Sequence, residues 1–394
     1  MKRIAFVNQR YGKEVNGGSE YYTMLMAQKL KAYYEVEVLT SKALTYEKWE
    51  DYYQEDVGQI DGITVRRFGV KRKRSRVLQR IFKILITRFG INTCKVTETW
   101  NKILGPYVPG LVKYIRDNNE KYDAFIFVTY LYYPAVFGMR EVAEKAIFVP
   151  TAHDEYFIYF KLYEELFHLP KKIVFLTPEE KEFVHSLFHN EQIENEVIGV
   201  GIDVPKNANA DSFRQKYGIE GDYLLYAGRV DTEKGCDEMF DYFCRYSKTG
   251  NDLQLIVIGK AYMNIPKQSN IRYLGFVSEE DKYNAIKGAK ILWLPSQFES
   301  LSIAVLEAMA LGVPVIVNGK CEVLKGHCDR SGGGRNYISY EGFIAELGIM
   351  TGTAEACYGE NARRYIERYY TWDNIIQRWK VLLDEVRLSN DVLS

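Results

Sequence analysis

Short runs of apolar, β-branched or aromatic residues alternate along this chain with longer segments of helical periodicity. RIAFVN (3–8) is followed by the helix-periodic segment 19–34 and then by EVEVLT (35–40). Such alternation predicts parallel strands joined by crossover helices. Further strands of this first series are expected at 124–130, 146–150 and 172–177, and a second series at 223–229, 253–259, 271–275, 291–295 and 313–318.

The segment GVGIDVPKNANAD (199–211) separates the two series, and its Gly, Pro and Asn residues break both periodicities. At 394 residues the chain is long enough for two domains of ordinary size. We therefore expect an α/β fold of two doubly wound, Rossmann-like domains, 1–204 and 205–370, with a ligand in a central cleft facing the carboxyl ends of both sheets. Segment 371–394 contains an amphipathic helix that begins at a Thr cap, and we expect it to cross back to the first domain.

The charge balance and the hydropathy exclude some classes of function. Lys and Arg together number 52, as do Asp and Glu, so the zero net charge argues against a dedicated nucleic-acid binder. No window offers the roughly 18 uncharged apolar residues that a membrane span needs. The short apolar run at the N-terminus predicts a strand rather than a signal peptide. The six cysteines form no CxxC pair, which is typical of reduced thiols in a cytoplasmic enzyme.

The first candidate for an anion site is the loop GKEVNGGSEYY. Its Gly17 and Gly18 follow the first expected strand and directly precede a helix. Glycine lets backbone amides approach an anion, and a helix N-terminus adds partial positive charge. The loop lacks the GxGxxG pattern of dinucleotide sites, and a plain turn capped by Ser19 is an equally good interpretation. Another glycine run, SGGGR (331–335), lacks the P-loop ending and is expected to be a flexible connection.

A second candidate is the loop RVDTEKG, which follows the strand expected at 223–229. It places Arg229 and Lys234 at the carboxyl edge of the second sheet. Two cations in that position can hold a diphosphate, Arg as a fork and Lys as a point charge. The alternative is a solvated Arg and a Lys paired with Asp231 or Glu233.

Two glutamates occur among apolar residues in FESLSIAVLEAMALGVPVIV (298–317). A helix that begins near Ser302 places Glu299 just before its N-terminus and Glu307 more than one turn inside. A carboxylate in the first position can accept hydroxyl groups of a sugar while nearby amides face a phosphate. The alternative makes Glu299 a partner of the helix dipole and Glu307 a surface acid. Because the apolar neighbours form the core face of the helix, neither acid is expected to need burial.

In combination, these motifs resemble the retaining glycosyltransferases of family 4, which have the GT-B fold. The resemblance spans nearly the whole chain and rests on the order and spacing of Gly17-Gly18, Arg229, Lys234, Glu299 and Glu307. It implies twin Rossmann-like domains, with a nucleotide-sugar donor held mainly by the second domain and an acceptor held mainly by the first. It implies no cofactor other than the donor substrate.

The resemblance also implies roles for the charged residues. Glu299 would accept hydroxyl groups of the donor sugar, and Glu307 would accept those of the ribose. Arg229 and Lys234 would hold the diphosphate, and backbone amides would assist them, namely those of Gly17, Gly18, Ile303 and Ala304.

The sugar and the base have further implied neighbours. Amides of Leu301 and Ser302 would approach the sugar, and many members of the family have Phe-Gly at these two positions. His153, in VPTAHDEY after a strand of the first domain, would lie by the reacting sugar. Val277, in the loop GFVSEED, would lie by the nucleobase.

The implied reaction transfers a glycosyl group with retention of its anomeric configuration. Negative charge develops on the leaving diphosphate, where Arg229, Lys234 and the helix-end amides would stabilise it. No DxD motif follows an expected strand, and these cations can take the place of a metal, so we expect metal-independent transfer. Front-side attack, which the resemblance implies, needs no nucleophile from the protein.

A basic segment of the first domain is the candidate for a membrane surface. Residues 62–97 contain eleven Lys or Arg and no acid. Within them, 70–90 carries apolar residues at helical spacing, namely Leu78, Ile81, Phe82, Leu85 and Phe89. A basic amphipathic helix of this kind can lie on an anionic membrane. The alternative is an ordinary helix whose apolar stripe packs in the core.

The sequence as a whole therefore predicts a retaining, metal-independent glycosyltransferase that acts on a glycan or lipid-linked acceptor in surface polysaccharide synthesis. We expect it in the cytoplasm, peripheral to the inner face of the cell membrane. A GT-B-type nucleotide-sugar epimerase is the alternative among enzymes. A non-catalytic sugar-nucleotide-binding or membrane-docking subunit is the alternative outside them.

Overall fold

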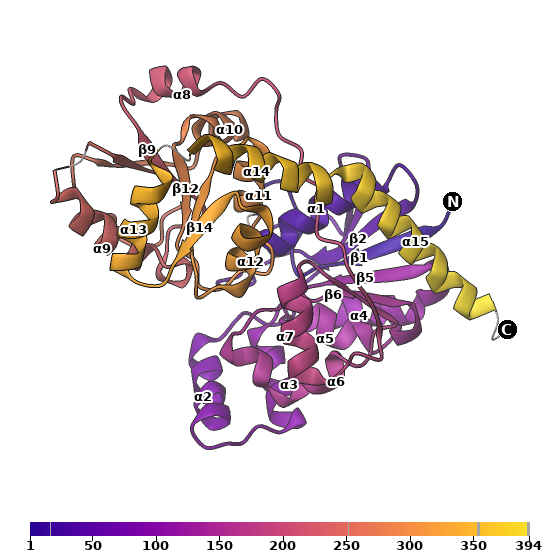
Figure 1. Ribbon diagram of the computed structural model, residues 1–394. Coiled ribbons are helices and arrows are strands. Elements are labelled where there is room, and N and C mark those ends of the chain that lie inside the picture. Colours follow the sequence, from indigo (N-terminus) through magenta and orange to yellow (C-terminus); the bar gives the residue numbers. More distant parts are fainter. Residues whose placement is uncertain (16, 251, 353–354, 392–394) are drawn as a thin grey trace. The chain divides into compact units, whose positions relative to one another are not determined.

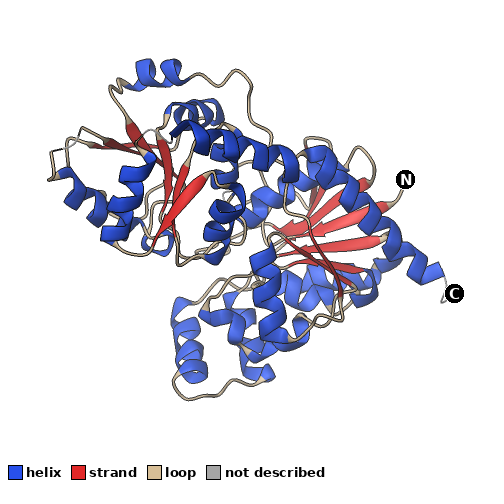
Figure 2. Cartoon of the chain, viewed as in Figure 1, coloured by secondary structure: helices blue, strands red, loops and turns tan. Residues whose placement is uncertain are grey.

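Each of the two predicted strand series forms a sheet of its own (Figures 1 and 2). The structure is a computed structural model that describes residues 1–15, 17–250, 252–352 and 355–391. The chain divides into two units, one made of residues 1–200 together with 375–394 and the other of residues 201–374. The prediction of an α/β fold with two Rossmann-like sheets is confirmed.

The sheet of the first unit has eight strands in the order β3-β4-β2-β1-β5-β6-β7-β8. Neighbouring strands are parallel except for the antiparallel pair β3 and β4 at one edge. Helices cover a parallel sheet on both faces, so its central strands are continuously apolar. The strands are β1 (Arg3–Val7), β2 (Glu35–Ser41), β3 (Val57–Ile60), β4 (Ile63–Phe68), β5 (Ala124–Val128), β6 (Ala146–Val149), β7 (Lys172–Phe175) and β8 (Glu194–Val197).

Seven α-helices of the first unit connect these strands, among the described residues. Trp100, Val136 and Tyr163 bring three of them into one apolar cluster with β5 and β6. The helices are α1 (Gly18–Leu30), α2 (Arg76–Thr87), α3 (Cys94–Leu104), α4 (Pro109–Asp117), α5 (Tyr133–Met139), α6 (Lys161–Leu166) and α7 (Pro178–Phe188), with short 3₁₀ turns at Asn119–Lys121, Ala143–Lys145 and Tyr156–Tyr159.

The last helix, α15 (Trp372–Asp391), completes the first unit from Ile375 onward. Its Trp379 is fully buried. Arg378 bonds to Glu196 at 2.7 Å, and the buried ammonium of Lys172 lies 2.6 Å from Glu385. The first unit is therefore built from two segments that lie far apart in the sequence.

The six strands of the second unit are all parallel and lie in the order β11-β10-β9-β12-β13-β14. The chain therefore reverses its direction of winding between β9 and β12, and in a doubly wound sheet ligands bind beyond the carboxyl ends of the strands at such a point. The strands are β9 (Tyr223–Ala227), β10 (Gln254–Ile258), β11 (Ile271–Gly275), β12 (Ile291–Leu294), β13 (Val315–Asn318) and β14 (Gly334–Tyr337).

Its helices are α8 (Ala210–Tyr217), α9 (Cys236–Ser247), α10 (Glu279–Gly288), α11 (Ile303–Ala310), α12 (Glu322–Ser331), α13 (Tyr340–Met350) and α14 (Glu355–Tyr369), with a 3₁₀ turn at Thr232–Lys234. In the described ranges of both units, no helix combines the length and the apolar character needed to cross a bilayer.

The expectation of a flexible connection at 331–335 is wrong. Gly334 and Arg335 begin β14, a strand that pairs with β13. A Cβ atom at Gly334 would lie 2.5 Å from the carbonyl oxygen of Val315 and 3.0 Å from Sγ of Cys328. The glycine is therefore needed for close packing of the strand, and its presence in the sequence was mistaken for flexibility.

Candidate functional site

The reversal of winding in the second unit brings together two loops that carry predicted site residues. One follows β9 and contains Arg229 and Lys234, and the other follows β12 and contains Glu299. Gly235 has a left-handed backbone with φ of 71°, and a Cβ there would lie 2.5 Å from the carbonyl oxygen of Pro295. Glycine at this position lets the two loops pack directly against each other.

Lys234 and Glu299 form an ion pair between these two loops. The Nζ atom of Lys234 lies 2.6 Å from Oε1 of Glu299, and both side chains are largely shielded from solvent. The backbone amide of Lys234 donates to Oδ1 of Asp231 at 2.9 Å, which fixes the turn. The structure thus brings together the residues predicted to hold the diphosphate and the donor sugar.

Arg229 is also paired with carboxylates. Its guanidinium bonds to Asp231, and its Nη2 lies 2.8 Å from Oε2 of Glu233. The carbonyl oxygen of Arg229 accepts a hydrogen bond from the Tyr226 hydroxyl at 2.6 Å. The alternative considered for this loop, a solvated Arg and a Lys paired with Asp231 or Glu233, is therefore wrong. Those two carboxylates pair with Arg229, and Lys234 pairs with Glu299. A bound diphosphate would compete with these carboxylates for both cations.

Helix α11 begins directly after the second loop. Its cap, Ser302, has a left-handed backbone with φ of 65° and makes no side-chain capping bond, and the first turn contains no acid. A non-glycine residue in this conformation is uncommon and often marks a functional site. Glu299 lies just before this helix end, no acid lies within its first turn, and the amides of Ile303 and Ala304 belong to that turn.

The expectation that Glu307 needs no burial is wrong, as is the alternative that it is a surface acid. Glu307 is only 4% exposed. Its Oε1 atom lies 2.8 Å from Nζ of Lys282 and accepts from the Tyr283 hydroxyl at 2.9 Å. Both partners are on α10, and a cation with a hydroxyl offsets the cost of burying the carboxylate. Among the described residues these two contacts use Oε1, which leaves Oε2 to accept from a ligand.

The two remaining residues predicted near the donor differ in exposure. Leu301 is buried, whereas Val277 is half-exposed in the loop between β11 and α10. Phe276, beside Val277, is 76% exposed. An exposed aromatic ring next to the expected nucleobase position is a feature that sequence reasoning missed.

Gly17, Gly18 and His153 belong to the first unit, and the other nine predicted site residues belong to the second. Gly17 is exposed and has an ordinary extended backbone. A Cβ there would lie 2.1 Å from Oε2 of Glu20, whose Oε1 is held by the buried Arg10 at 2.8 Å. Gly18 opens α1 with free space around it.

His153 lies just beyond the carboxyl end of β6. Its Nε2 atom is 3.5 Å from Oε1 of Glu155, and the same oxygen accepts from the Tyr130 hydroxyl at 2.6 Å. The turn before it is strained, because Thr151 is β-branched and has φ of 52°. The side chains of the loop are thus held in a defined arrangement at the edge of the sheet.

Glu180, on α7, holds this loop through one of its two hydrogen bonds to backbone amides. Its Oε1 accepts from the amide of Ala152, and its Oε2 accepts from the amide of Leu176, both at 2.6 Å. Burial raises the pKa of Glu180 to about 8, although the two amides act in the opposite direction. In the sequence, Glu180 is an ordinary acid in the first turn of a helix, so nothing there indicates this contact.

His327, on α12, was also missed. The ring is fully buried, with Nε2 2.8 Å from the carbonyl oxygen of Leu301 and Nδ1 3.1 Å from the Tyr365 hydroxyl. Burial lowers its pKa from 6.5 to about 4. The histidine is therefore neutral at physiological pH.

The lowered pKa of His327 predicts a loss of stability in acid. Between pH 6.5 and 4 the unfolded chain binds a proton that the folded chain excludes, so the free energy of unfolding falls as the pH falls. From pH 7 to pH 5 we expect this group to remove about 2 kcal/mol. Denaturant unfolding at the two pH values measures the loss, which should be smaller in His327→Gln. An equal loss in that variant would contradict the assignment.

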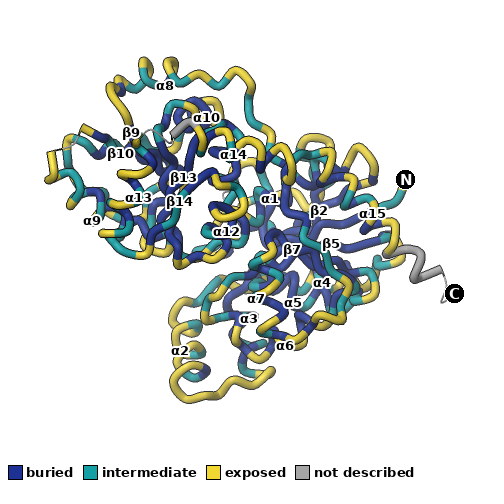
Figure 3. Tube along the Cα trace, in the orientation of Figure 1, coloured by how far each residue is buried: buried dark blue, intermediate teal, exposed yellow. Residues whose placement is uncertain are grey.

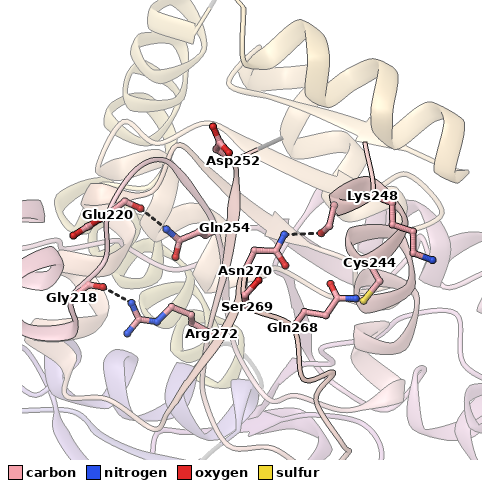
Figure 4. Close-up of a pocket in the computed structure, with 11 residues that line it drawn as sticks. Gly218, Glu220, Cys244, Lys248, Asp252, Gln254, Gln268, Ser269, Asn270 and Arg272 are labelled. Carbon is pink, nitrogen blue, oxygen red and sulfur yellow. Dashed lines mark hydrogen bonds between the residues drawn. The ribbon is translucent and has the colours of Figure 1, made fainter. Parts of the chain in front are cut away.

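A wide pocket of about 810 Å³ lies elsewhere in the second unit, at the amino ends of β10 and β11 (Figure 4). Arg272 donates to the carbonyl oxygen of Gly218 at 2.5 Å, and Asn270 donates to Oγ of Ser247 at 2.8 Å. These two donors of the pocket are thus bonded to the protein itself. The pocket lies at the edge of the sheet opposite the predicted site. In the part of the chain that the structure describes, no three or more His, Cys, Asp or Glu residues are grouped as a metal site would require.

Comparison with known proteins finds a family that matches part of the second unit. Residues 209–325 match the model of the family "Glycosyl transferases group 1". The chain is 26% identical over 228 residues to an uncharacterized glycosyltransferase of Methanocaldococcus jannaschii, covering 52% of this chain and 57% of that protein. It is 25% identical over 203 residues to the mannosylfructose-phosphate synthase of Agrobacterium fabrum, covering 45% and 44%. The chain thus spans about half of the length of these relatives.

Solved structures match almost the entire chain. A sucrose-phosphate synthase from Thermosynechococcus elongatus superimposes with a TM-score of 0.74 at 14% identity, covering 99% of this chain and 100% of that one. Anabaena HepE in complex with UDP and glucose gives 0.70 at 13% identity, covering 98% and 100%. WaaG, a glycosyltransferase involved in lipopolysaccharide biosynthesis, gives 0.65 at 16% identity, covering 96% and 99%. At such low identities these matches show the fold.

Proposed function

We propose that this chain, which belongs to the glycosyl transferases group 1 family and has the GT-B fold, is a retaining glycosyltransferase that takes its sugar from a nucleotide-diphosphate donor. The observation that carries the proposal is the pairing of Lys234 with Glu299 beside the N-terminus of α11, at the point where the winding of the sheet reverses. These elements lie inside the segment that matches the family.

The second unit is the donor-binding unit in this proposal. Arg229, Lys234 and the first amides of α11 stabilise the negative charge that develops on the leaving diphosphate. Glu299 accepts hydroxyl groups of the sugar. Glu307 accepts a ribose hydroxyl through Oε2, the oxygen not used by Lys282 and Tyr283. A neighbour of known structure, HepE, was solved with UDP and glucose, which supports a nucleotide sugar as the donor.

The first unit is the acceptor-binding unit, with His153 beside the reacting sugar and the amides of Gly17 and Gly18 assisting the diphosphate. The acceptor we propose is a glycan or a lipid-linked glycan in surface polysaccharide synthesis. The likeness to WaaG, whose role is in lipopolysaccharide biosynthesis, supports this choice. A nucleotide-sugar epimerase and a non-catalytic sugar-nucleotide-binding subunit are the alternatives, and turnover with retained anomeric configuration separates the proposed enzyme from both.

Transfer is expected to need no metal ion, because two cationic side chains and a helix end already face the expected diphosphate position. Purified protein should release nucleoside diphosphate slowly from UDP-glucose or GDP-mannose, and the rate should be unchanged by EDTA. The product anomer, followed by NMR with a trapping alcohol, should retain the donor configuration. Loss of the activity in EDTA and its recovery with Mg²⁺ or Mn²⁺ would contradict metal independence.

The basic segment 70–90 supports a membrane-bound acceptor. Its helix α2 buries only Ile86 among its residues, and it is largely exposed (Figure 3). Val77, Ile81 and Ile84 are 71%, 47% and 41% exposed. At about 100° per residue, these three lie together on the face opposite Ile86.

The face formed by Val77, Ile81 and Ile84 is therefore outside the core of the first unit. On the other side of the helix, Ile86 is buried in the core and Phe82 packs partly against it. The alternative of a core stripe is wrong for Leu78, Ile81 and Phe89, which are 43%, 47% and 66% exposed. At the same spacing, the basic residues of α2, Arg76, Arg80 and Lys83, lie along one side of this face. We propose that α2 lies on an anionic membrane at the cytoplasmic side, where each basic residue adds about 1 kcal/mol of attraction.

Vesicle flotation tests this surface. The protein is expected to float with phosphatidylglycerol vesicles at low salt and to remain unbound with phosphatidylcholine alone. Val77→Glu with Ile81→Glu should weaken binding about 100-fold, because burying each apolar side chain contributes about 1.5–3 kcal/mol. Ile338→Glu, at another exposed apolar residue, is the matched control and should float as the parent does. Absence of binding by the parent protein at low salt would end the proposal.

A further inference from the structure

A chain of buried hydrogen bonds within the second unit ends at the loop that carries the predicted sugar site. The hydroxyls of Tyr370 and Tyr365 are 3.3 Å apart, and the Tyr365 hydroxyl lies 3.1 Å from Nδ1 of His327. Nε2 of His327 lies 2.8 Å from the carbonyl oxygen of Leu301. None of the residues predicted from the sequence to form the site, other than Leu301, belongs to this chain of bonds.

The Leu301 carbonyl fixes the direction of every bond. A carbonyl oxygen can only accept, so Nε2 of His327 carries the proton and donates it. The neutral ring then has a lone pair on Nδ1, which accepts from the Tyr365 hydroxyl. Burial lowers the pKa of His327 to about 4, so the ring stays in this form at neutral pH.

The Leu301 carbonyl matters because of the residue that follows it. A trans peptide is planar, and its C=O and N–H point in opposite directions. The bond from His327 to the carbonyl of Leu301 therefore aims the amide of Ser302 away from the buried side of the loop. Ser302 itself has a left-handed backbone, with φ of 65°. Such a conformation costs free energy and persists only where the surroundings enforce it.

We infer that His327 is a positioning residue for the donor sugar, which it orients through the Leu301–Ser302 peptide, with Tyr365 holding the ring in the required tautomer. The inference rests on the proposed function. His327 then helps the protein to distinguish a nucleotide sugar from a bare nucleoside diphosphate, although it contacts neither ligand directly. The groups proposed for the diphosphate and the ribose are held by other contacts, namely those of Arg229, Lys234 and Glu307.

The far end of the hydrogen-bond chain lies where the polypeptide enters and leaves the second unit. The amide of Ile202 donates to the carbonyl oxygen of Tyr370 at 2.8 Å. A Cβ atom at Gly201 would lie 2.3 Å from the ring of Trp372, so these two segments are packed without a gap. The sugar loop is thereby tied to both ends of the unit through Tyr365 and Tyr370.

Thermal shift with matched ligands tests the inference on the full chain. UDP and UDP-glucose are compared, as are GDP and GDP-mannose, and the pair that stabilises the parent protein is used. In His327→Leu the affinity for the bare diphosphate should stay within twofold of the parent value. The affinity for the nucleotide sugar should fall about tenfold, the effect of losing one oriented hydrogen bond.

His327→Gln is the matched control, because its amide can still donate to the Leu301 carbonyl and should restore most of the sugar-dependent affinity. Tyr365→Phe removes a single hydroxyl and should give a smaller loss of the same kind. If diphosphate and nucleotide sugar weaken in parallel, or if Gln and Leu behave alike, His327 has only a structural role and the inference is overturned. A parent protein that binds none of the four ligands overturns the proposed function, and the inference with it.

Discussion

Replacing Lys234 with alanine is expected to lower the rate of donor turnover by about a hundredfold to a thousandfold, the usual cost of removing one group that stabilises charge in a transition state. The reason is the position of its ammonium group, 2.6 Å from Glu299, a residue that lies just before α11. In the proposed reaction, a cation at this point lowers the barrier to bond breaking by stabilising the charge on the leaving diphosphate. The measurement is the initial rate of nucleoside diphosphate release in a coupled assay.

Two controls make the Lys234 result specific. Lys248→Ala removes an exposed lysine that follows α9 in the same unit, and its rate should match that of the parent. Glu299→Gln should also lose turnover, because it replaces one accepting carboxylate oxygen with an NH2 group and removes the negative charge that pairs with Lys234. If Lys234→Ala keeps more than a tenth of the parent rate, the cation has no part in the chemical step.

Glu307→Ala is expected to weaken the binding of any nucleoside diphosphate about 10- to 100-fold. A hydrogen bond to a charged group contributes about 1.5–3 kcal/mol, and Glu307 is proposed to accept one from the ribose. Because the acid is 4% exposed, the variant should also be less stable, since Lys282 loses its partner at 2.8 Å and keeps only the looser contact with Glu279 at 3.8 Å. Calorimetry gives the affinity, and denaturant unfolding gives the stability.

A paired substitution separates these two effects of Glu307. Glu307→Leu combined with Lys282→Met removes the acid and its cationic partner together, so much of the stability should return. The nucleotide affinity should stay low, because the carboxylate that accepts the ribose hydroxyl is still absent. Recovery of both quantities in the double variant would mean that Glu307 serves only the packing of α10 against α11.

In the second unit, the candidate site residues that directly follow strands could be predicted from the sequence. Arg229, Lys234 and Glu299 each follow a buried strand closely, and parallel strands deliver their loops to the same edge of a sheet. Lys282 and His327 could not be found in this way. Both are on helices, and their contacts depend on which face of α10 or α12 is turned toward α11, which periodicity in one helix does not determine.

The same limit explains the incorrect expectations. The sequence of α2 shows that it has an apolar face, and only the packing of Ile86 and Phe82 shows that most of this face is turned away from the core. The carboxylate of Glu307 was expected to avoid burial because its partners, Lys282 and Tyr283, lie 25 and 24 residues away in the chain. The sequence alone also does not show that Gly334 packs closely against Val315 and Cys328, which is why flexibility was expected there.

The split construction of the first unit has a consequence for synthesis on the ribosome. Residues 1–200 emerge first, yet Trp379 and the partners of Lys172 and Glu196 are supplied by α15, near the end of the described chain. The second unit, in contrast, is one continuous stretch that can fold as soon as it has left the exit tunnel. The first unit therefore cannot be completed until the whole of the second unit and α15 have been translated. Until then, the apolar surface that α15 covers stays exposed on the nascent chain. A stop codon shortly before α15 would consequently damage the unit that was made first.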